Sequence, residues 1–292
     1  MKLDLVYNPG SGRHQPVHID QLKAAFQAEG FAVNTVLVRF TGTALSDDAD
    51  LICVCGGDGT LNAVAASLRA CHVDTPLCVF PAGTINLLAR ELRYSANVRH
   101  FAARVAKAFH QGRKNWRTSP LFAMGEVPVM TCLSCGPDSA AVALCSPRLK
   151  QRFGRFAYVV AALKLLRNWP QQKLQIQGEL EDGKAFALSA EAIMVARGRY
   201  YAGPFRLSPL ARLDSTGVEV LVMSRASRLR AGLFMLALAL RIPPSALGLA
   251  QRLSARSVRI DGSTLPIQID GDICEVSDLE LKPTGRNILY CA

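Results

Sequence analysis

Three short turns combine glycine with hydroxyl, amide and carboxylate side chains, and each directly follows an apolar, strand-like segment. They read NPGSGR at 8–13, GGDGTLN at 56–62 and PAGTIN at 81–86. Glycine lets backbone N–H groups approach a polyphosphate, because no Cβ intervenes. The helices expected to open after Thr60 and Thr84 would add free N–H groups and a positive dipole end. The sequence therefore predicts a phosphate-binding site.

The polar side chains of these turns fit the same chemistry. Ser11, next to Gly12, and the hydroxyls of Thr60 and Thr84 can donate hydrogen bonds to phosphate oxygens. Asp58 would repel a phosphate unless it holds Mg²⁺, directly or through water, or orients a donor. The simpler alternatives are a tight turn at the glycines and helix N-capping by the threonines. The first turn lacks the third glycine of a dinucleotide fingerprint, and no P-loop lysine is present, so backbone groups must supply much of the binding.

The elements that would position these turns alternate between strands and helices. Such alternation predicts a parallel sheet covered on both faces, which binds ligands at the carboxyl ends of its strands. We expect strands at 3–7, 31–39, 51–55 and 76–80, and helices at 17–29, 60–70, 85–93 and 97–111, the last ended by Gly112.

After about residue 118 short alternating segments dominate, which indicates antiparallel β structure with helices near 154–168 and 228–241. EDGK at 181–184 and the Asp-Gly pairs at 261–262 and 270–271 are typical of hairpin turns. GELEDGK at 178–184 has the spacing of a Walker A loop up to its lysine, but it joins two strand-like segments and is interpreted as a hairpin.

Composition narrows the class of protein. The 292 residues are half apolar and carry a net charge of +11, which suits nucleotides or an anionic membrane surface. No nucleic-acid-binding signature accompanies the charge, so we expect no nucleic-acid partner.

The cysteines and the first residues indicate the compartment. The chain has nine cysteines without the spacing of a disulfide framework, which favours a protein with reduced thiols in the cytoplasm. Asp4 interrupts what would be the apolar core of an export signal, so we expect none. The Cys132–Cys135 pair does not have the context of a redox or zinc motif. The apolar run at 231–240 is too short to span a bilayer. Both a monomer and a homodimer remain open.

GGDGTLN with PAGTIN, preceded by NPGSGR, resembles the diacylglycerol-kinase catalytic-domain family of bacterial lipid kinases, which is related to sphingosine and ceramide kinases. Segments 149–166, 195–214 and 265–272 fall where such kinases carry similar segments. The resemblance implies an α/β fold in two domains. A Rossmann-like, NAD-kinase-like three-layer domain at 1–118 would bind ATP, and an antiparallel β-sandwich domain at 119–292 would shape the lipid site.

The resemblance also implies roles for individual residues. The nucleotide contacts would come from the three turns and from a threonine after the second strand: Asn8, Ser11, Gly12, Thr41, Gly56, Gly57, Asp58, Gly59, Thr60, Asn62, Gly83 and Thr84. Asp58 would act in catalysis near Mg²⁺. Asp272 would be the general base, in an Asp270-Gly271-Asp272 sequence where the family usually has Asp-Gly-Glu. Asp214 would belong to a second magnesium site whose segment is altered here.

We therefore predict an ATP- and Mg²⁺-dependent kinase of a diacylglycerol-like lipid alcohol, cytoplasmic and peripherally bound to an anionic membrane. Arg148, Lys150, Arg152 and Arg155, which precede an apolar helix, would contact that membrane, although a solvated helix flank is an equal alternative. A kinase of another lipid alcohol such as a sphingoid base, an NAD kinase, and a non-catalytic nucleotide- or lipid-binding protein remain the alternatives.

Overall fold

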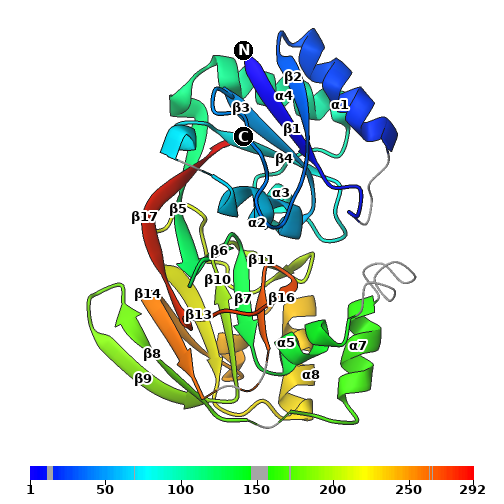
Figure 1. Cartoon of the computed structure of the whole chain (residues 1–292). Coiled ribbons are helices and arrows are strands. Elements are labelled where there is room, and N and C mark those ends of the chain that lie inside the picture. Colours follow the sequence, from blue (N-terminus) through cyan, green and yellow to red (C-terminus); the bar gives the residue numbers. More distant parts are fainter. Residues whose placement is uncertain (12–15, 69, 146–156, 171, 263, 265) are drawn as a thin grey trace. The chain divides into compact units, whose positions relative to one another are not determined.

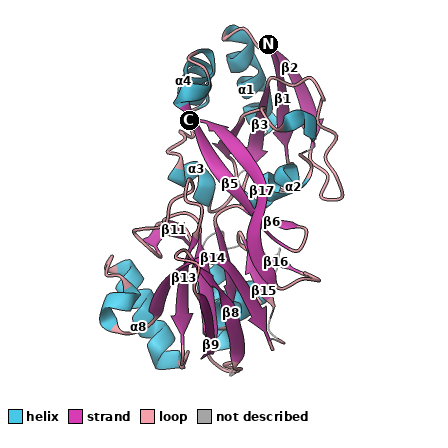
Figure 2. Cartoon of the chain, turned by 90° about the vertical axis from the view of Figure 1, so that its left-hand side faces the viewer, coloured by secondary structure: helices cyan, strands magenta, loops and turns pink. Residues whose placement is uncertain are grey.

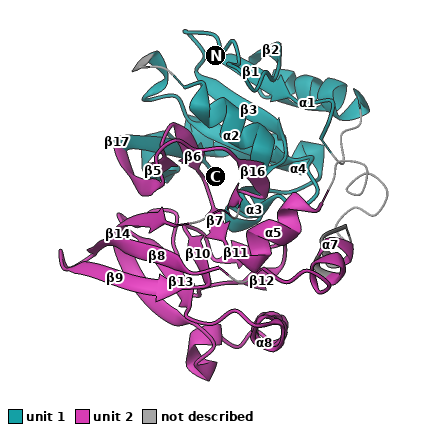
Figure 3. Cartoon of the chain, turned by 60° about the horizontal axis from the view of Figure 1, so that its bottom comes forward, with its two compact units in different colours: residues 1–121, 285–292 teal, residues 122–284 magenta. Residues whose placement is uncertain are grey.

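The chain forms two compact units, residues 1–121 with 285–292 and residues 122–284 (Figure 3). The structure, a computed structural model, describes residues 1–11, 16–68, 70–145, 157–170, 172–262, 264 and 266–292. The last eight residues, placed by the sequence analysis in the second domain, belong to the first unit. They do so because the final strand continues into the sheet of that unit.

The first unit is built on a parallel sheet in the order β17-β4-β3-β1-β2 (Figure 1). Its strands are β1 (Lys2–Tyr7), β2 (Ala32–Leu37), β3 (Leu51–Gly56), β4 (Leu77–Pro81) and the end of β17 (Glu280–Cys291). Every residue of β3 is buried, as expected for an uninterrupted apolar strand in the middle of a parallel sheet. β2, on the edge, is largely exposed.

Helices cover both faces of this sheet. They are α1 (Pro16–Ala28), α2 (Asp58–Ala66), α3 (Leu87–Glu91) and α4 (Val98–His110), with short 3₁₀ turns η1 (Ala70–His72) and η2 (Arg113–Asn115). The connections β1–α1–β2 and β3–α2–β4 run in opposite directions along the sheet, so right-handed crossovers put α1 and α2 on opposite faces. This confirms the three-layer prediction for the first domain.

The core of the first unit is rich in edge-to-face aromatic contacts. Phe101 of α4 packs against Phe26 of α1, Phe80 of β4 and Tyr94. The Tyr94 hydroxyl donates to the carbonyl oxygen of Cys291 at 2.6 Å, which anchors the end of β17 in this unit. Asn97 caps α4 by accepting from the backbone N–H of His100 at 3.0 Å.

The second unit is antiparallel (Figure 2). Its main sheet runs β16-β15-β7-β10-β13-β14, and β14 also pairs with β8 and with the beginning of β17. The strands are β5 (Trp116–Met124, which begins in the first unit), β6 (Val127–Val129), β7 (Cys132–Cys135), β8 (Leu174–Leu180), β9 (Ala185–Ala190), β10 (Ala192–Ala196), β11 (Tyr200–Tyr201), β12 (Phe205–Arg206), β13 (Val218–Met223), β14 (Gln251–Asp261), β15 (Ile267–Ile269) and β16 (Asp272–Cys274). One apolar cluster, including Phe122, Ile176, Val195 and Val258, forms its core.

Three helices and one 3₁₀ turn complete the described part of this unit: α5 (Pro137–Ala143), α7 (Ala157–Leu165), α8 (Arg228–Ala239) and η4 (Pro244–Leu247). Among the described residues, no helix is long and apolar enough to cross a membrane. The basic residues 148–155 of the sequence analysis lie outside the described residues.

Two of the three predicted hairpin turns form. Residues 181–184 join β8 to β9, and the Asp-Gly pair at 270–271 joins β15 to β16. The first result confirms that GELEDGK is a hairpin. The prediction at 261–262 is wrong, because the strands on either side of this turn do not pair with each other. β14, which Asp261 ends, pairs with β8, β13 and β17, and the next strand, β15, pairs with β7 and β16.

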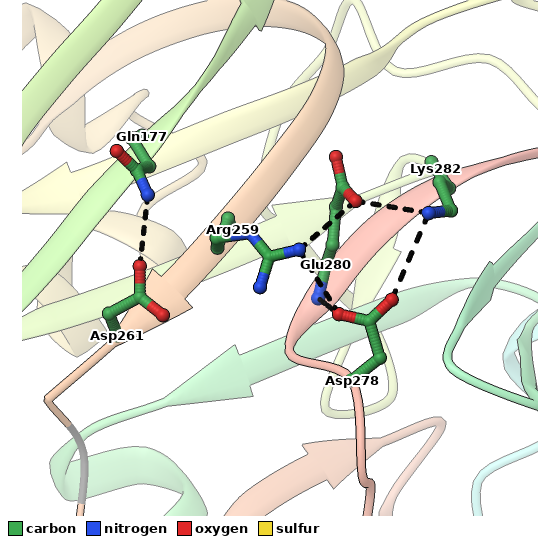
Figure 4. Close-up of polar contacts among 6 residues, drawn as sticks. All are labelled: Gln177, Arg259, Asp261, Asp278, Glu280 and Lys282. Atoms are coloured by element: carbon green, nitrogen blue, oxygen red, sulfur yellow. Dashed lines mark hydrogen bonds and ion pairs between the residues drawn. The ribbon is translucent and has the colours of Figure 1, made fainter.

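A charged network holds the start of β17 against β14 (Figure 4). Arg259 contacts Asp278 and Glu280, each at 3.2 Å, and Lys282 contacts the same two carboxylates. These groups are partly exposed, so each pair contributes about 0–1 kcal/mol. Their role here is to fix the strand that leads the chain back to the first unit.

Candidate functional site

The three glycine-rich turns lie at one edge of the first unit's sheet. The registers Tyr7↔Cys55 and Cys55↔Phe80 align the carboxyl ends of β1, β3 and β4, so the segments that follow them are neighbours. This is the edge at which open α/β sheets bind ligands. The juxtaposition expected from the sequence is therefore confirmed for the part of these turns that the structure describes. Gly12 lies outside the described residues.

Asn8 and Thr60 connect the first turn to the second. Asn8 Nδ2 donates to the buried Thr60 hydroxyl at 3.1 Å, and Ser11 Oγ lies 3.4 Å from that hydroxyl. Asn8 Oδ1 accepts from the Gly10 N–H at 2.9 Å. Gly56 is required here because an added Cβ would lie 2.5 Å from the Thr60 Cβ. The Thr60 hydroxyl thus shapes the turn as well as offering a donor.

Two glycines bring the second and third turns into backbone contact. A Cβ added to Gly83 would lie 2.3 Å from the Cα of Gly57, so the two backbones touch where any side chain would collide. Asn86 holds Gly83 from both sides, accepting from its N–H and donating to its carbonyl oxygen, each at 2.8 Å. Asn86 has φ +58, in the left-handed region that asparagine tolerates well. Asn86 is the last residue of the PAGTIN motif, and nothing local in that motif predicts this role.

Asp58 ties the second turn to α3. Its carboxylate accepts from the backbone N–H groups of Leu87, at 2.9 Å, and Leu88, at 3.2 Å. The expectation that both helices present free N–H groups therefore needs correction, because Asp58 occupies those at the start of α3. α2 begins at Asp58 itself, and Gly57 before it provides no side-chain cap. The N-terminus of α2 is thus the better anion site.

Asp58 therefore orients the start of α3. A carboxylate is also a ligand type that Mg²⁺ takes, directly or through water, so the chemistry of this residue fits a hydrated Mg²⁺ near the turn.

The other predicted nucleotide contacts are less enclosed. Asn62, in α2, and Thr84 are half-buried, whereas Thr41 is exposed in the loop after β2. The buried threonine of that loop is Thr43, whose N–H donates to Ser67 Oγ at 2.9 Å and whose hydroxyl contacts the backbone of Arg39. No pattern in the sequence distinguished Thr43 from Thr41.

In the second unit, Asp270 and Asp272 flank a tight hairpin turn and have different environments. Asp270 and Gly271 have φ of +50 and +94, as a type I′ turn requires. The carboxylate of Asp270 is buried and accepts four hydrogen bonds of 2.6–3.0 Å from the Met130 N–H, the Thr131 N–H and hydroxyl, and the Cys132 N–H. Asp272 is exposed at the start of β16. Of the two aspartates, only Asp272 is exposed to solvent.

Asp214 has an environment unlike that of a metal ligand. Its two carboxylate oxygens accept from Arg212 Nε and Nη2 at 2.9 and 2.8 Å, which puts a permanent positive charge beside them. A cation would have to displace this guanidinium.

A buried polar cluster around Asp138 was missed by the sequence analysis. One oxygen of Asp138, in the first turn of α5, accepts from the hydroxyls of Ser134, at 2.5 Å, and Tyr201. Ser134 Oγ also lies 2.9 Å from Gln268 Oε1, and its single proton serves one of these two acceptors at a time. Burial raises the pKa of Asp138 above its ordinary value, and burial together with the neighbouring Asp138 raises that of Tyr201. Buried groups with shifted pKa values mark functional candidates.

The raised pKa of Asp138 predicts a pH dependence of stability. A carboxyl that holds its proton more tightly when folded contributes stability that is fully present below the unfolded pKa, 3.8, and is lost as the pH rises through the folded pKa. The amide oxygen of Asp138→Asn can accept from both hydroxyls and does not ionise. We expect urea unfolding to show the variant gaining on the wild type as the pH rises above the unfolded pKa of 3.8. Asp182→Asn, which changes an exposed carboxylate, is the control and should show no such gain. A difference between Asp138→Asn and wild type that is constant with pH would contradict the assignment.

One set of three residues among those described has metal-ligand geometry outside the turns. Ligand atoms of Asp47, Cys71 and His72 lie within 4.8 Å of one another. They precede β3 and β4 and so lie at the amino-terminal edge of the sheet, opposite the glycine-rich turns. Hence they do not belong to the phosphate site.

Comparison with known proteins agrees with this architecture. Residues 2–114 match the model of the diacylglycerol kinase catalytic domain, and residues 131–280 match that of the YegS C-terminal NAD kinase beta sandwich-like domain. A diacylglycerol kinase of Staphylococcus carnosus is 26% identical over 244 residues, covering 79% of this chain and 75% of that protein. One from Bacillus subtilis is 26% identical over 236 residues, covering 76% and 74%.

A crystal structure of a diacylglycerol kinase from Bacillus anthracis has the same fold, with a TM-score of 0.73 at 18% identity, over 99% of this chain and 96% of that one. The two matched domains, in this order, define an enzyme of the lipid kinase class. The chain belongs to the diacylglycerol kinase catalytic-domain family, in the branch that carries a YegS C-terminal domain.

Proposed function

We propose that this kinase transfers the γ-phosphate of ATP to the hydroxyl of diacylglycerol. The observation that carries the proposal is how the start of α2 is held. The backbones of Gly57 and Gly83 are in contact, and Asp58 bonds the start of α2 to that of α3. These contacts fix the uncapped N-terminus of α2 at the sheet edge where nucleotides would bind. The relatives named diacylglycerol kinase support the choice of acceptor.

The first unit would bind the nucleotide. The phosphates would lie at the start of α2, among the turn residues Asn8, Ser11, Gly12, Gly56, Gly57, Gly59, Thr60, Asn62, Gly83 and Thr84, with Thr41 contacting the rest of the nucleotide. Asp58 would hold Mg²⁺, directly or through water, and the bound ion would supply charge neutralisation for the phosphates. We do not extend this proposal to Asp214, because of its ion pair with Arg212.

Asp272 would act as the general base. The lipid hydroxyl oxygen forms a bond to the γ-phosphorus while the bond from that phosphorus to the β–γ bridging oxygen breaks. The hydroxyl proton moves to Asp272, and ADP leaves with the electron pair. The rigid turn pinned by Asp270 would hold Asp272 in place, which offsets part of the reach lost by replacing glutamate with the shorter aspartate.

We further propose that the enzyme works in the cytoplasm as a peripheral protein on an anionic membrane, where its substrate resides. The net charge of +11 supports this location. No nucleic-acid partner is proposed, and both a monomer and a homodimer are compatible with this function.

The test is ATP-dependent phosphate transfer to a panel of diacylglycerol, a sphingoid base, ceramide and NAD. We expect transfer to diacylglycerol, a loss of about 10²- to 10⁴-fold in kcat for Asp272→Asn, and near-normal activity for Asp182→Asn, an exposed aspartate of another hairpin turn. Transfer to another acceptor alone would replace diacylglycerol in the proposal. Binding of Mg-ATP without transfer to any acceptor would overturn the kinase proposal in favour of a non-catalytic role.

A further inference from the structure

One face of α8 exposes a line of leucines. Leu229, Leu233, Leu236 and Leu240, the last immediately after the helix, have exposed fractions of 73%, 42%, 53% and 61%. Their spacing of four, three and four residues puts them on one side of the helix. We call these four residues the α8 face. Soluble proteins seldom expose a continuous apolar surface of this kind without a binding partner.

The opposite side of α8 is also apolar and already has a packing partner. Phe234, Ala237 and Leu238 are buried in the second unit. α8 is thus apolar on both sides, although only one side is needed for the fold. A helix that is apolar on all sides is expected where all of its sides are removed from water. The α8 face therefore indicates that a second apolar environment covers this side of the helix.

The charged residues in α8 and beside it in sequence are all positive, and one carboxylate from elsewhere, that of Glu191, accepts from the Ala226 N–H just before the helix. Residues 220–260 contain seven arginines and no aspartate or glutamate. Arg225, Arg228 and Arg241 are exposed near the two ends of the helix. Arg230 is directed elsewhere, because its Nη2 donates to the carbonyl oxygen of Gly248 at 2.8 Å. An apolar surface between exposed arginines complements a bilayer with acidic headgroups.

α7, in the same unit (Figure 1), also exposes apolar side chains. They are Leu163 and, just after its end, Leu166. Trp169, shortly after α7, donates through Nε1 to the carbonyl oxygen of Ala226, just before α8, at 2.6 Å. This bond connects the segment that follows α7 to the one that precedes α8, so the end of α7 lies near the start of α8.

We propose that the α8 face, with the neighbouring end of α7, docks the enzyme on an anionic bilayer, with α8 lying in the plane of the headgroups. Its twelve residues are about half the length needed to span the hydrocarbon core. A second copy of this chain is a poorer occupant, because two identical faces would bring like-charged arginines together. This inference rests on the proposed function, since it names the surface that would reach a substrate held in the membrane.

The test is sedimentation with vesicles in the absence of ATP, using phosphatidylcholine alone or mixed equally with phosphatidylglycerol. We expect wild type to bind the mixed vesicles and Leu229→Ser/Leu236→Ser to bind ~100-fold more weakly. The control Leu37→Ser/Leu210→Ser changes two leucines exposed elsewhere and should bind like wild type. Arg225→Gln/Arg228→Gln should lose most of the preference for phosphatidylglycerol.

Two outcomes would overturn the docking surface. One is equal vesicle binding by wild type and Leu229→Ser/Leu236→Ser. The other is a wild-type dimer that this variant dissociates while no form binds vesicles, which would assign the face to a second copy. A parallel kinase assay with a short-chain diacylglycerol dispersed in detergent keeps the two proposals separate. Activity in that assay without vesicle binding overturns the docking surface alone, and vesicle binding without activity overturns the kinase proposal alone.

Discussion

Replacing Gly83 with alanine should abolish phosphate transfer. The new Cβ would lie 2.3 Å from the Cα of Gly57 and 2.7 Å from Asn86 Oδ1. The first of these is a backbone atom, so the turns must separate. Overpacking of this kind costs about 1–3 kcal/mol of stability. Because Gly57 begins α2, the displacement also moves the N–H groups proposed to bind phosphate, and we expect kcat/KM for ATP to fall by at least ~100-fold.

The control is a glycine-to-alanine substitution at a position where the added Cβ meets no other atom. A Cβ at Gly232, in α8, has no atom within 4 Å, so Gly232→Ala should raise stability by about 0.5–1 kcal/mol. Gly57→Ala, whose Cβ would lie 3.0 Å from the Cα of Gly83, should be less harmful than Gly83→Ala. Urea unfolding and ATP titrations measure both effects. Normal ATP binding by Gly83→Ala would show that the contact of the two turns is not needed for the site.

Asp270→Ala should destabilise the second unit by about 3–5 kcal/mol. The substitution leaves four donors without their carboxylate acceptor, in a place closed to water. It also puts alanine at φ +50, which adds about 1 kcal/mol of backbone strain. Asp270→Asn keeps one acceptor oxygen and tolerates the left-handed conformation, so an intermediate loss is expected.

Asp272→Asn provides the contrast two residues away. Its side chain is exposed, so the change in unfolding free energy should stay within about 0.5 kcal/mol while transfer is lost. Denaturant unfolding together with initial rates separates the two roles. If Asp270→Ala were as stable as wild type, or if Asp272→Asn unfolded, the assignment of one aspartate to structure and the other to chemistry would be wrong.

Local patterns were sufficient to predict three central strands of the first unit, although not the return of β17 to its sheet. The strands expected at 3–7, 51–55 and 76–80 correspond to β1, β3 and β4 to within one residue at each end. Their apolar runs and the glycine-rich segments after them act through neighbours in sequence. The helix expected at 60–70 is α2, which starts at Asp58 and ends at Ala66, because Gly57 already allows the turn into the helix.

Roles that depend on distant partners were not visible in the sequence. Asp58 meets the N–H of Leu87, 29 residues away, and Asp270 meets that of Met130, 140 residues away. Both aspartates belong to short Asp-Gly sequences that look alike. Neither short sequence shows whether its carboxylate accepts hydrogen bonds from backbone N–H groups or faces solvent. Asp272 is an example of the second kind.

The sequence by itself determined the order of the elements in the first unit and the sheet edge at which its glycine-rich turns meet, because these follow from apolar periodicity and from the backbone freedom of glycine. The family of this kinase was indicated by the resemblance of those turns to known motifs. Only the tertiary structure decided which aspartate is structural, that Asn86 holds the third turn, that Asp138 is buried among hydroxyls and that the α8 face remains exposed. The physical reason is that burial and hydrogen-bond partners depend on which segments pack together, and that information is spread over the whole chain.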